Sequence, residues 1–409
     1  MRLNACNQRG HHPQSLMHAL LVFSHLRWNF VYQRPQHLLT RLAEQWPVVY
    51  VEEPVPGAAS DHLEVIDVAD GVQVWRPHLR STQHGMHGAN EAAMQRLVLA
   101  AMHSRRISSY IAWFYTPMAM FMADVLEPEC IAYDCMDELS MFKGAPAELM
   151  AQEKALFNQA DIVFTGGRSL YQAKRTLHDS VHCFPSSVDA RHFSTPTADH
   201  PLQAAIPRPR LGYCGVIDER VDIDLVAGIA SLRPDWQIVM VGPTAKIDPA
   251  GLPKLPNIHW MGQQDYQVLP AFIQGWDVCL LPFALNDSTR FISPTKTLEY
   301  MAGGRPCVST AIRDVVESYG DLVKIRADAA GFVEASEALM QRDAAQRLAD
   351  ERAVQSILAG TSWDATATTM GDLIAQVLDT RVRPVGRTTT AAPATAAGAH
   401  SAATDLTTS

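Results

Sequence analysis

Residues 278–309 read VCLLPFALNDSTRFISPTKTLEYMAGGRPCVS, and the pattern of apolar side chains within them changes twice. Apolar runs at 278–282 and 307–309 are typical of buried strands. Between them, residues 294–302 carry apolar side chains at helical spacing, with a proline in the first turn and a glycine as the stop signal. A strand, a helix and a second strand in this order predict a parallel βαβ unit.

The same alternation continues on both sides of this stretch, which predicts the α/β class with parallel sheets covered on both faces. We expect strands at 19–25, 48–52, 110–114, 130–134, 161–165, 211–216, 238–241, 259–261 and 322–325, and a hairpin at 63–68 and 72–76. We expect helices at 36–45, 90–103, 118–126, 147–159, 168–178, 222–232, 266–275, 312–319, 330–341 and 344–358.

A proline-rich stretch separates two series of expected strands and helices, which predicts two domains. The expected division is a loose N-terminus at 1–17, a first domain at 18–195, a linker at 196–209, a second domain at 210–362, a final helix at 363–380 and a tail at 387–409. The final helix could pack back on the first domain. The tail contains mostly Ala, Thr, Ser and Gly, a composition typical of disorder.

Composition narrows the function classes. The chain has 409 residues and a formal net charge of −9, which disfavours a general electrostatic grip on nucleic acid. We find no signal peptide and no apolar run long enough to span a bilayer. Seven cysteines without a C-x-x-C pair favour a reducing, cytoplasmic setting. Arg105-Arg106 and the arginines at 381–387 could touch the inner face of a membrane, although a solvated surface is the plainer interpretation.

The start of the helix at 294–302 is the strongest candidate site. Ser293 is placed as its N-cap and Pro294 in its first turn, and the free N–H groups at the start of a helix suit a phosphate. Lys296 adds a positive charge in the first turn. Glu299 lies one turn further on, where a carboxylate could accept hydrogen bonds from two vicinal ribose hydroxyls. The alternative is a well-capped helix with a local Lys–Glu pair.

Two glycine-containing turns follow strands of the second half. Gly215 would let a ligand approach the backbone closely, and Arg220 in the same loop could clamp a diphosphate. Gly242 ends the next strand in a similar way. Taken alone, a surface loop with solvated charges is the better interpretation of the Gly215–Arg220 loop, and the Gly242 turn is weak evidence, since neither forms a G-x-G-x-x-G or a Walker motif.

The first half offers aromatic, amide and charged groups at strand ends. The loop at 24–37 carries Trp28, Gln33, Arg34 and His37, a mixture that suits sugar rings or simply a polar helix start. Carboxylates at Asp134, Asp137 and Glu138 could act as a base, an acceptor clamp or turn caps. The histidines at 84 and 87 lack neighbouring ligands, so no metal site is expected there.

Two motifs, F-x-x-Q-R-P-Q-H at 30–37 and S-P-x-K-x-x-E-Y at 293–300, carry a family resemblance over roughly residues 18–380. The chain resembles two-domain GT-B glycosyltransferases, and its second half resembles glycosyltransferase family 4. The first half is similar to a bacterial subgroup from cell-envelope and exopolysaccharide loci, including teichuronic acid glycosyltransferases. The resemblance implies two Rossmann-like domains facing across a cleft, with parallel sheets.

The resemblance also implies roles for residues. The substrate would be a nucleoside-diphosphate sugar, and the partner a glycan or lipid-linked acceptor, with retention of configuration and neither a cofactor nor an essential metal. Lys296 and Arg220 would hold the diphosphate as catalytic groups. The implied donor-binding residues are Gly215, Gly242, Gly262, Ser293, Pro294, Thr295 and Glu299, with the nucleobase beside 259–262. The implied acceptor or sugar-binding residues are Trp28, Gln33, Arg34, His37, Asp134 and Asp137.

The chain departs from the family pattern at two places. Phe291 stands where the first glutamate of the family motif contacts the sugar, and Asn286, Asp287 or Ser293 could substitute for it. Residues 115–117 replace the usual histidine of the first domain. Two alternatives therefore stay open: a nucleotide-sugar epimerase of the same fold, which the carboxylates at 134–138 would serve, and a non-catalytic binding partner in glycan assembly. Donor turnover without acceptor would separate the epimerase, and binding without turnover would favour the partner.

Overall fold

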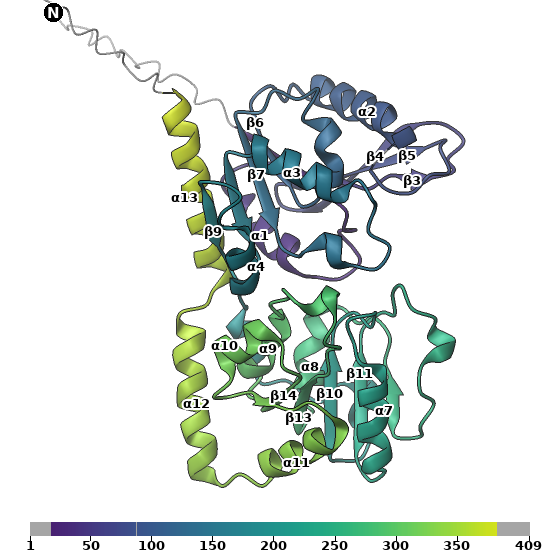
Figure 1. Ribbon diagram of the computed structural model, residues 1–409, viewed down its shortest axis with the longest axis vertical. Coiled ribbons are helices and arrows are strands. Elements are labelled where there is room, and N and C mark those ends of the chain that lie inside the picture. The colour runs from purple at the N-terminus through teal and green to yellow at the C-terminus, as the bar shows by residue number, and fades with distance from the viewer. Residues whose placement is uncertain (1–17, 87, 383–409) are drawn as a thin grey trace, which may run out of the picture.

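Continuous apolar strands have built two parallel sheets, each covered by helices, in the computed structural model of the protein (Figure 1). The structure describes residues 18–86 and 88–382, so the expected loose N-terminus at 1–17 and the tail at 387–409 lie outside the described residues. We call the layers around the first sheet the N-terminal unit and those around the second sheet the C-terminal unit.

The sheet of the N-terminal unit runs in the order β3-β5-β2-β1-β6-β7-β8-β9, with β4 antiparallel to β5 and the other pairs parallel. Its strands are β1 Ala19–Ser24, β2 Val48–Glu52, β3 Val55–Pro56, β4 His62–Ala69, β5 Val72–Leu79, β6 Tyr110–Phe114, β7 Cys130–Cys135, β8 Ile162–Thr165 and β9 Val181–Cys183. Its helices are α1 Arg34–Leu42, α2 Glu91–Ser104, α3 Leu149–Gln159 and α4 Arg168–Lys174, with 3₁₀ turns at Gly88–Asn90, Pro117–Met122 and Leu139–Met141.

The sheet of the C-terminal unit runs in the order β12-β11-β10-β13-β14-β15 and is parallel throughout. Its strands are β10 Arg210–Cys214, β11 Gln237–Val241, β12 Ile258–Trp260, β13 Val278–Leu281, β14 Cys307–Ser309 and β15 Lys324–Ile325. Its helices are α5 Ala190–Ser194, α6 Pro201–Ala204, α7 Ile223–Leu232, α8 Leu269–Ile273, α9 Thr295–Ala302, α10 Arg313–Tyr319, α11 Ala329–Met340 and α12 Ala344–Ala359, with 3₁₀ turns at Pro249–Gly251, Tyr266–Val268 and Asp287–Thr289.

In both sheets the strand order reverses next to the first strand of the sheet. The crossover changes sides between β1 and β6 in the N-terminal unit and between β10 and β13 in the C-terminal unit. Open α/β sheets bind ligands at this switch point, outside the carboxyl ends of the strands. The topology therefore marks one edge of each sheet as the place for a site.

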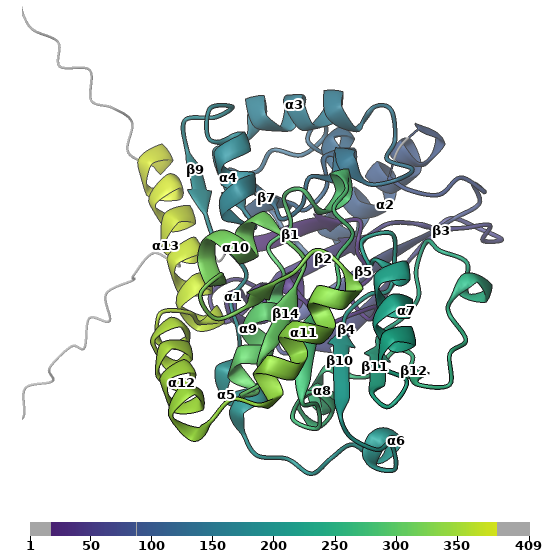
Figure 2. The same cartoon turned by 60° about the horizontal axis from the view of Figure 1, so that its bottom comes forward.

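The last helix, α13 Trp363–Val382, returns to the N-terminal unit and packs against α1 and β7. Figures 1 and 2 show α12 and α13 following one another along the same side of the molecule, α12 beside the second sheet and α13 beside the first. Apolar side chains at helical spacing along α13 join the core on that face. They are Trp363, Ala367, Met370, Ile374 and Leu378.

Two expected helices differ in type from those observed, and a proline explains one of them. The helix expected at 118–126 is the 3₁₀ segment Pro117–Met122, capped by the Thr116 side chain. The helix expected at 266–275 is divided into a 3₁₀ turn and the short α8, because Pro270 suits only a first helical turn. The stretch expected as a linker contains α6, whose buried Gln203 accepts a hydrogen bond from Trp276 Nε1 at 3.0 Å.

Candidate functional site

A cavity of about 210 Å³ lies between the two units, where strands of both sheets end. Met136 and Gly166 line it immediately after β7 and β8, and Gly215 and Gly242 line it immediately after β10 and β11. The carboxyl ends of the two sheets therefore face one another across this space. Such a position is the one that the topology marks for a ligand.

Bare backbone forms part of the cavity wall on the C-terminal unit. Gly215 and Gly242 have φ angles of 157° and 145°, and a Cβ on Gly242 would lie 1.8 Å from the Gly215 carbonyl oxygen. Only glycine tolerates so close an approach. Gly262 lies outside the cavity lining, but its carbonyl accepts a hydrogen bond from Gly242 N at 2.8 Å and so supports that wall.

Helix α9 points its N-terminus into the cavity, and Ser293, Pro294, Thr295, Lys296 and Glu299 all belong to the lining. The expected N-cap at Ser293 is wrong. The helix begins at Thr295, Pro294 occupies the cap position in an extended conformation, and no side chain caps the helix. Because a proline side chain has no acceptor, the first N–H groups of α9 keep no side-chain partner at the cap.

Lys296 and Glu299 form an ion pair within the cavity wall, with 2.7 Å between Lys296 Nζ and Glu299 Oε2. The local Lys–Glu pair expected as the alternative is thus present, and it lies at the cavity rather than on the outer surface. Burial acts to lower the pKa of Lys296, but the Glu299 carboxylate outweighs it and the pKa stays above its ordinary value. The lysine is therefore a fixed positive charge in the first turn of the helix.

Arg220 brings a second positive charge to the same wall. Its guanidinium forms two hydrogen bonds with the Asp218 carboxylate, from Nε at 3.1 Å and Nη2 at 2.7 Å to Oδ2. It also lies over the ring of Phe142 from the N-terminal unit, 5.5 Å from the ring centroid. These contacts fix the direction of the guanidinium toward the space between the units.

Three of the expected residues of the first domain reach the cavity, namely Gln33, Arg34 and Asp137. Arg34 is buried and pairs with Asp134, with 2.9 Å from Nε to Oδ2 and 2.8 Å from Nη2 to Oδ1. Asp134 itself lies behind Arg34, outside the lining. Burial raises the pKa of Asp137 from 3.8 to about 6, against the opposing effect of Arg220 and Arg34.

The structure does not bring Trp28 or His37 to the cavity. Trp28 is 8% exposed and packs edge-on against Tyr50 in the core. His37 stacks on Trp363 of α13, with ring centroids 4.7 Å apart. Burial and the nearby charges of Arg41 and Lys296 hold the pKa of His37 well below its ordinary value, so its ring is neutral. Both aromatic side chains serve packing in this position.

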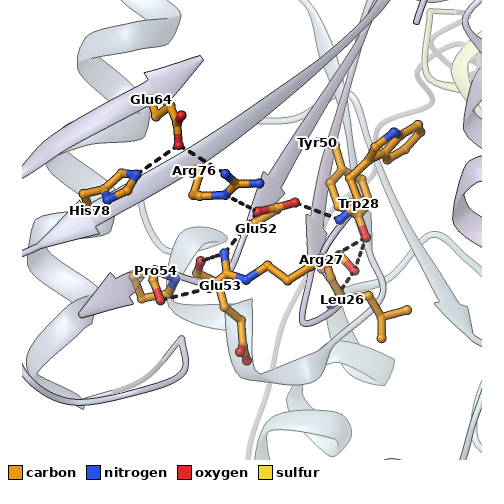
Figure 3. A network of polar contacts seen from close by, with 11 residues as sticks. Leu26, Arg27, Trp28, Tyr50, Glu52, Glu53, Pro54, Glu64, Arg76 and His78 are labelled. Carbon is orange, nitrogen blue, oxygen red and sulfur yellow. Dashed lines mark hydrogen bonds and ion pairs between the residues drawn. The ribbon is translucent and has the colours of Figure 1, made fainter. Parts of the chain in front are cut away.

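A polar network explains why Trp28 turns away (Figure 3). Glu52, at the end of β2, is fully buried and its Oε1 accepts a hydrogen bond from Trp28 N at 2.8 Å. Its Oε2 accepts from Arg27 Nη1 at 3.0 Å and from Arg76 Nε at 2.7 Å. The carboxylate therefore holds the loop after β1 by its backbone, which directs the indole into the core.

The residues expected to substitute for the missing motif glutamate also differ in whether they reach the cavity. Phe291 packs against the core of the N-terminal unit. Asn286 and Asp287 are exposed and lie outside the cavity lining, whereas Ser293 belongs to it. Of these three candidates, Ser293 is the one that the structure places at the site.

Several lining residues were missed by the sequence analysis, and Tyr266 and Gln264 are the most polar on the C-terminal unit. Residues 266–275 were interpreted as a helix, which hid the aromatic side chain at its start. Unlike Gly215 and Gly242, Tyr266 does not directly follow a strand, because β12 ends at Trp260, so strand ends gave no signal for it. Tyr213, Met136, Gly166 and Ser186 were missed as well.

Within residues 18–86 and 88–382, the structure contains no group of three or more His, Cys, Asp or Glu side chains placed to hold a metal ion. In the same part of the chain, no helix combines the length and the apolar character needed to cross a membrane.

Solved structures of other proteins share this two-unit architecture. Sucrose-phosphate synthase from Thermosynechococcus elongatus aligns with a TM-score of 0.71 at 16% identity, over 89% of this chain and 100% of that chain. HepE from Anabaena, solved in complex with UDP and glucose, aligns with a TM-score of 0.60 at 13% identity, over 88% of this chain and 99% of that chain. The protein has the GT-B fold. The expected fold class, two parallel sheets facing across a cleft, is confirmed.

Sequence comparison agrees with this GT-B assignment. Residues 208–342 match the family model described as glycosyl transferases group 1. TuaH of Bacillus subtilis strain 168, whose name describes a teichuronic acid biosynthesis glycosyltransferase, is 23% identical over 216 residues, which are 48% of this chain. The aligned region spans 54% of TuaH, so the chain matches about half the length of this curated relative. The resemblance to glycosyltransferases is thus found in both kinds of comparison.

Proposed function

We propose that this protein is a glycosyltransferase that moves a sugar from a nucleoside-diphosphate sugar to a cell-envelope or exopolysaccharide acceptor. The observation that carries the proposal is the convergence of the α9 N-terminus, Lys296, Arg220 and Glu299 in the cavity between the units. The match of residues 208–342 to glycosyl transferases group 1 supports the reaction class. The similarity to TuaH supports a cell-envelope acceptor. We propose that the protein reaches this acceptor from the cytoplasmic side, at times at the inner face of the membrane.

The proposed transfer depends on positive groups that stabilise the negative charge of the leaving nucleoside diphosphate. Departure of the nucleoside diphosphate builds negative charge on the phosphate that leaves the sugar. Lys296, Arg220 and the uncapped N–H groups of α9 present positive charge or hydrogen-bond donors on one wall. Fixed donors of this kind stabilise a developing anion without reorganising. We therefore propose a metal-independent reaction, and retention of configuration as in the family that the chain resembles.

In this proposal, residues of the same cavity wall also bind the nucleotide. Glu299 is 2% exposed and is held by Lys296, so its carboxylate is oriented to accept hydrogen bonds from ribose hydroxyls. The glycines at the ends of β10 and β11 let the ligand lie directly on the backbone. On the opposite wall, Gln33 and Asp137 are placed to contact the transferred sugar or the acceptor.

The epimerase alternative loses support from the pairing of its carboxylates. Asp134 is bound by Arg34, and Glu138 is bound by Lys174 with 2.7 Å between Lys174 Nζ and Glu138 Oε2. Of the three clustered carboxylates, Asp137 is the one in the cavity lining. The non-catalytic alternative rests on Phe291, whose side chain packs into the N-terminal unit instead of supplying a carboxylate.

The test is a thermal-shift panel of UDP-, GDP-, dTDP- and ADP-sugars, each with and without EDTA. We expect one nucleotide to raise the melting temperature, with no effect of EDTA, because a ligand that binds only the folded state stabilises it. Release of nucleoside diphosphate in the presence of an acceptor glycan then establishes transfer. Binding without release would favour the non-catalytic partner, and a shift that EDTA abolishes would contradict metal independence.

A further inference from the structure

Tyr266 is a half-buried tyrosine whose buried hydroxyl the proposed chemistry leaves unused. It lies in the 3₁₀ turn after β12 and lines the cavity together with Glu299 and Lys296. Its Oη is buried, and within the described part of the chain it makes no hydrogen bond. Buried hydroxyls nearly always have a partner, because leaving one unpaired costs about 1–3 kcal/mol. An unpartnered hydroxyl at a cavity wall is therefore a place for a ligand atom.

The ring of Tyr266 is held on both faces. Tyr32 from the N-terminal unit stacks on it with centroids 4.6 Å apart, and His192 of α5 stacks on it at 4.5 Å. Phe193 approaches it edge-on at 5.6 Å. Tyr266 itself lines the cavity, so these stacking contacts hold a residue of the cavity wall in place. The clamp also fixes the direction of the hydroxyl before any ligand arrives.

The surroundings of the hydroxyl identify the part of the ligand that it would meet. Tyr266 and Glu299 line the same cavity. Burial raises the pKa of Tyr266, and the negative charge of Glu299 raises it further. The hydroxyl thus stays protonated at neutral pH and can both donate and accept a hydrogen bond. The Glu299 carboxylate offers acceptors alone. The hydroxyl of Tyr266 and this carboxylate together therefore suit a ligand with adjacent hydroxyl groups.

We propose that Tyr266 is a specificity residue of the nucleotide site, whose Oη hydrogen bonds to a ribose hydroxyl beside Glu299. The inference rests on the proposed function, since it assumes a nucleoside diphosphate in the cavity. It adds a contact from the turn after β12 to those from α9. It also links the ligand to Tyr32, so that the group that binds ribose is itself stacked against the opposite unit.

The experiment is calorimetric titration of UDP, GDP and ADP into the wild type and Tyr266→Phe. The variant removes one oxygen and keeps the stacked ring, so its melting temperature without ligand should equal or exceed that of the wild type, because the unpaired hydroxyl is gone. We expect the tightest of the three nucleotides to bind about five- to tenfold more weakly. The 2′,3′-dideoxy analogue of that nucleotide should bind both proteins equally. Tyr319→Phe, the same change on α10 outside the cavity lining, is the matched control and should keep its affinity within about twofold.

The outcomes separate the two claims. Unchanged nucleotide affinity in a folded Tyr266→Phe overturns the role of Tyr266 and leaves the proposed function standing. An equal loss for the dideoxy analogue overturns the assignment to the ribose. A wild type that binds none of the three nucleotides and gives no shift with any sugar of the panel overturns the proposed function and this inference with it.

Discussion

Glu299 and Lys296 sit in the cavity wall as an ion pair, and each is available to a different part of a nucleotide. The carboxylate can accept from hydroxyl groups, and the ammonium can donate to phosphate oxygens. Their spacing of three residues on one helix turn makes the pair visible in the sequence. That this pair lies at a cavity depends on the strand order. This order places the start of α9 at the carboxyl ends of the strands, where the two sheets face one another.

Glu299→Gln tests this pair. We expect nucleoside-diphosphate affinity to fall by about 1–3 kcal/mol, because the amide loses charge-assisted hydrogen bonds to the ribose. Titration calorimetry with the nucleotide found in the thermal panel measures the loss. Glu317→Gln, an exposed glutamate on α10 that pairs with Arg313, is the control and should leave the affinity unchanged. Equal affinity in a folded Glu299→Gln would contradict the ribose contact.

Several of the expected residues that line the cavity lie directly after a strand or at the start of α9. Gly215, Gly242 and Lys296 could be located in this way, since strand ends and helix starts leave local signals. Trp28 could not, because its orientation is set by Glu52, which lies 24 residues further along the chain. Tyr266 was missed because residues 266–275 were interpreted as one helix, whereas Tyr266 lies in a separate 3₁₀ turn.

At the scale of elements, α4 and α10 join the two units by a helix cap that crosses between them. Gly167 at the N-cap of α4 has no side chain, and Asp314 of α10 takes over the capping. Its Oδ2 accepts from Arg168 N and its Oδ1 from Ser169 N, both at 2.9 Å. A Cβ on Gly167 would lie 2.4 Å from Asp314 Oδ2, so glycine is needed for this approach.

Asp314→Ala should therefore loosen the contact between the units. We expect a loss of about 1 kcal/mol for the cap and a larger radius of gyration in X-ray scattering, because the cap joins separate units. Asp222→Ala removes an ordinary cap within the C-terminal unit, where Asp222 accepts from Leu225 N at 2.8 Å. It should cost a similar amount of stability without changing the radius. Identical scattering from the two variants would refute the cap as a link between the units.

Element boundaries were predicted well where apolar periodicity was long and poorly where it was short. The βαβ pattern at 278–309 is confirmed by β13, α9 and β14. The short edge strands β3 and β9 were not expected, although the equally short β12, β14 and β15 were. The N-cap at Ser293 failed because Pro294 is itself extended and takes the cap position.

On the scale of the whole molecule, the meeting of the two units creates the environment of Asp137. The carboxylate belongs to the N-terminal unit and faces Arg220 of the C-terminal unit. Burial raises its pKa from 3.8 to about 6. The folded protein therefore holds an extra proton between those pH values, and the contribution of Asp137 to stability decreases as the pH rises through about 6.

The substitution Asp137→Asn should remove the loss of stability that Asp137 causes at high pH. We expect its melting temperature to exceed that of the wild type at pH 8, by an amount equivalent to about 1–3 kcal/mol, and to approach the wild-type value near pH 4. Differential scanning fluorimetry across this range measures the change in slope. Asp70→Asn in the exposed β4–β5 turn is the control and should show no such slope change. A parallel pH profile for Asp137→Asn and the wild type would disprove the shift.

The return of α13 to the N-terminal unit has a consequence for synthesis on the ribosome. The apolar face of α1, with Leu38, Leu39 and Leu42, shares its core with Trp363 and Met370. The chain delivers these partners only after the whole C-terminal unit has been made. The half of the protein that is translated first is therefore the half whose folding is completed last, and its exposed α1 face must wait through some 320 residues of elongation.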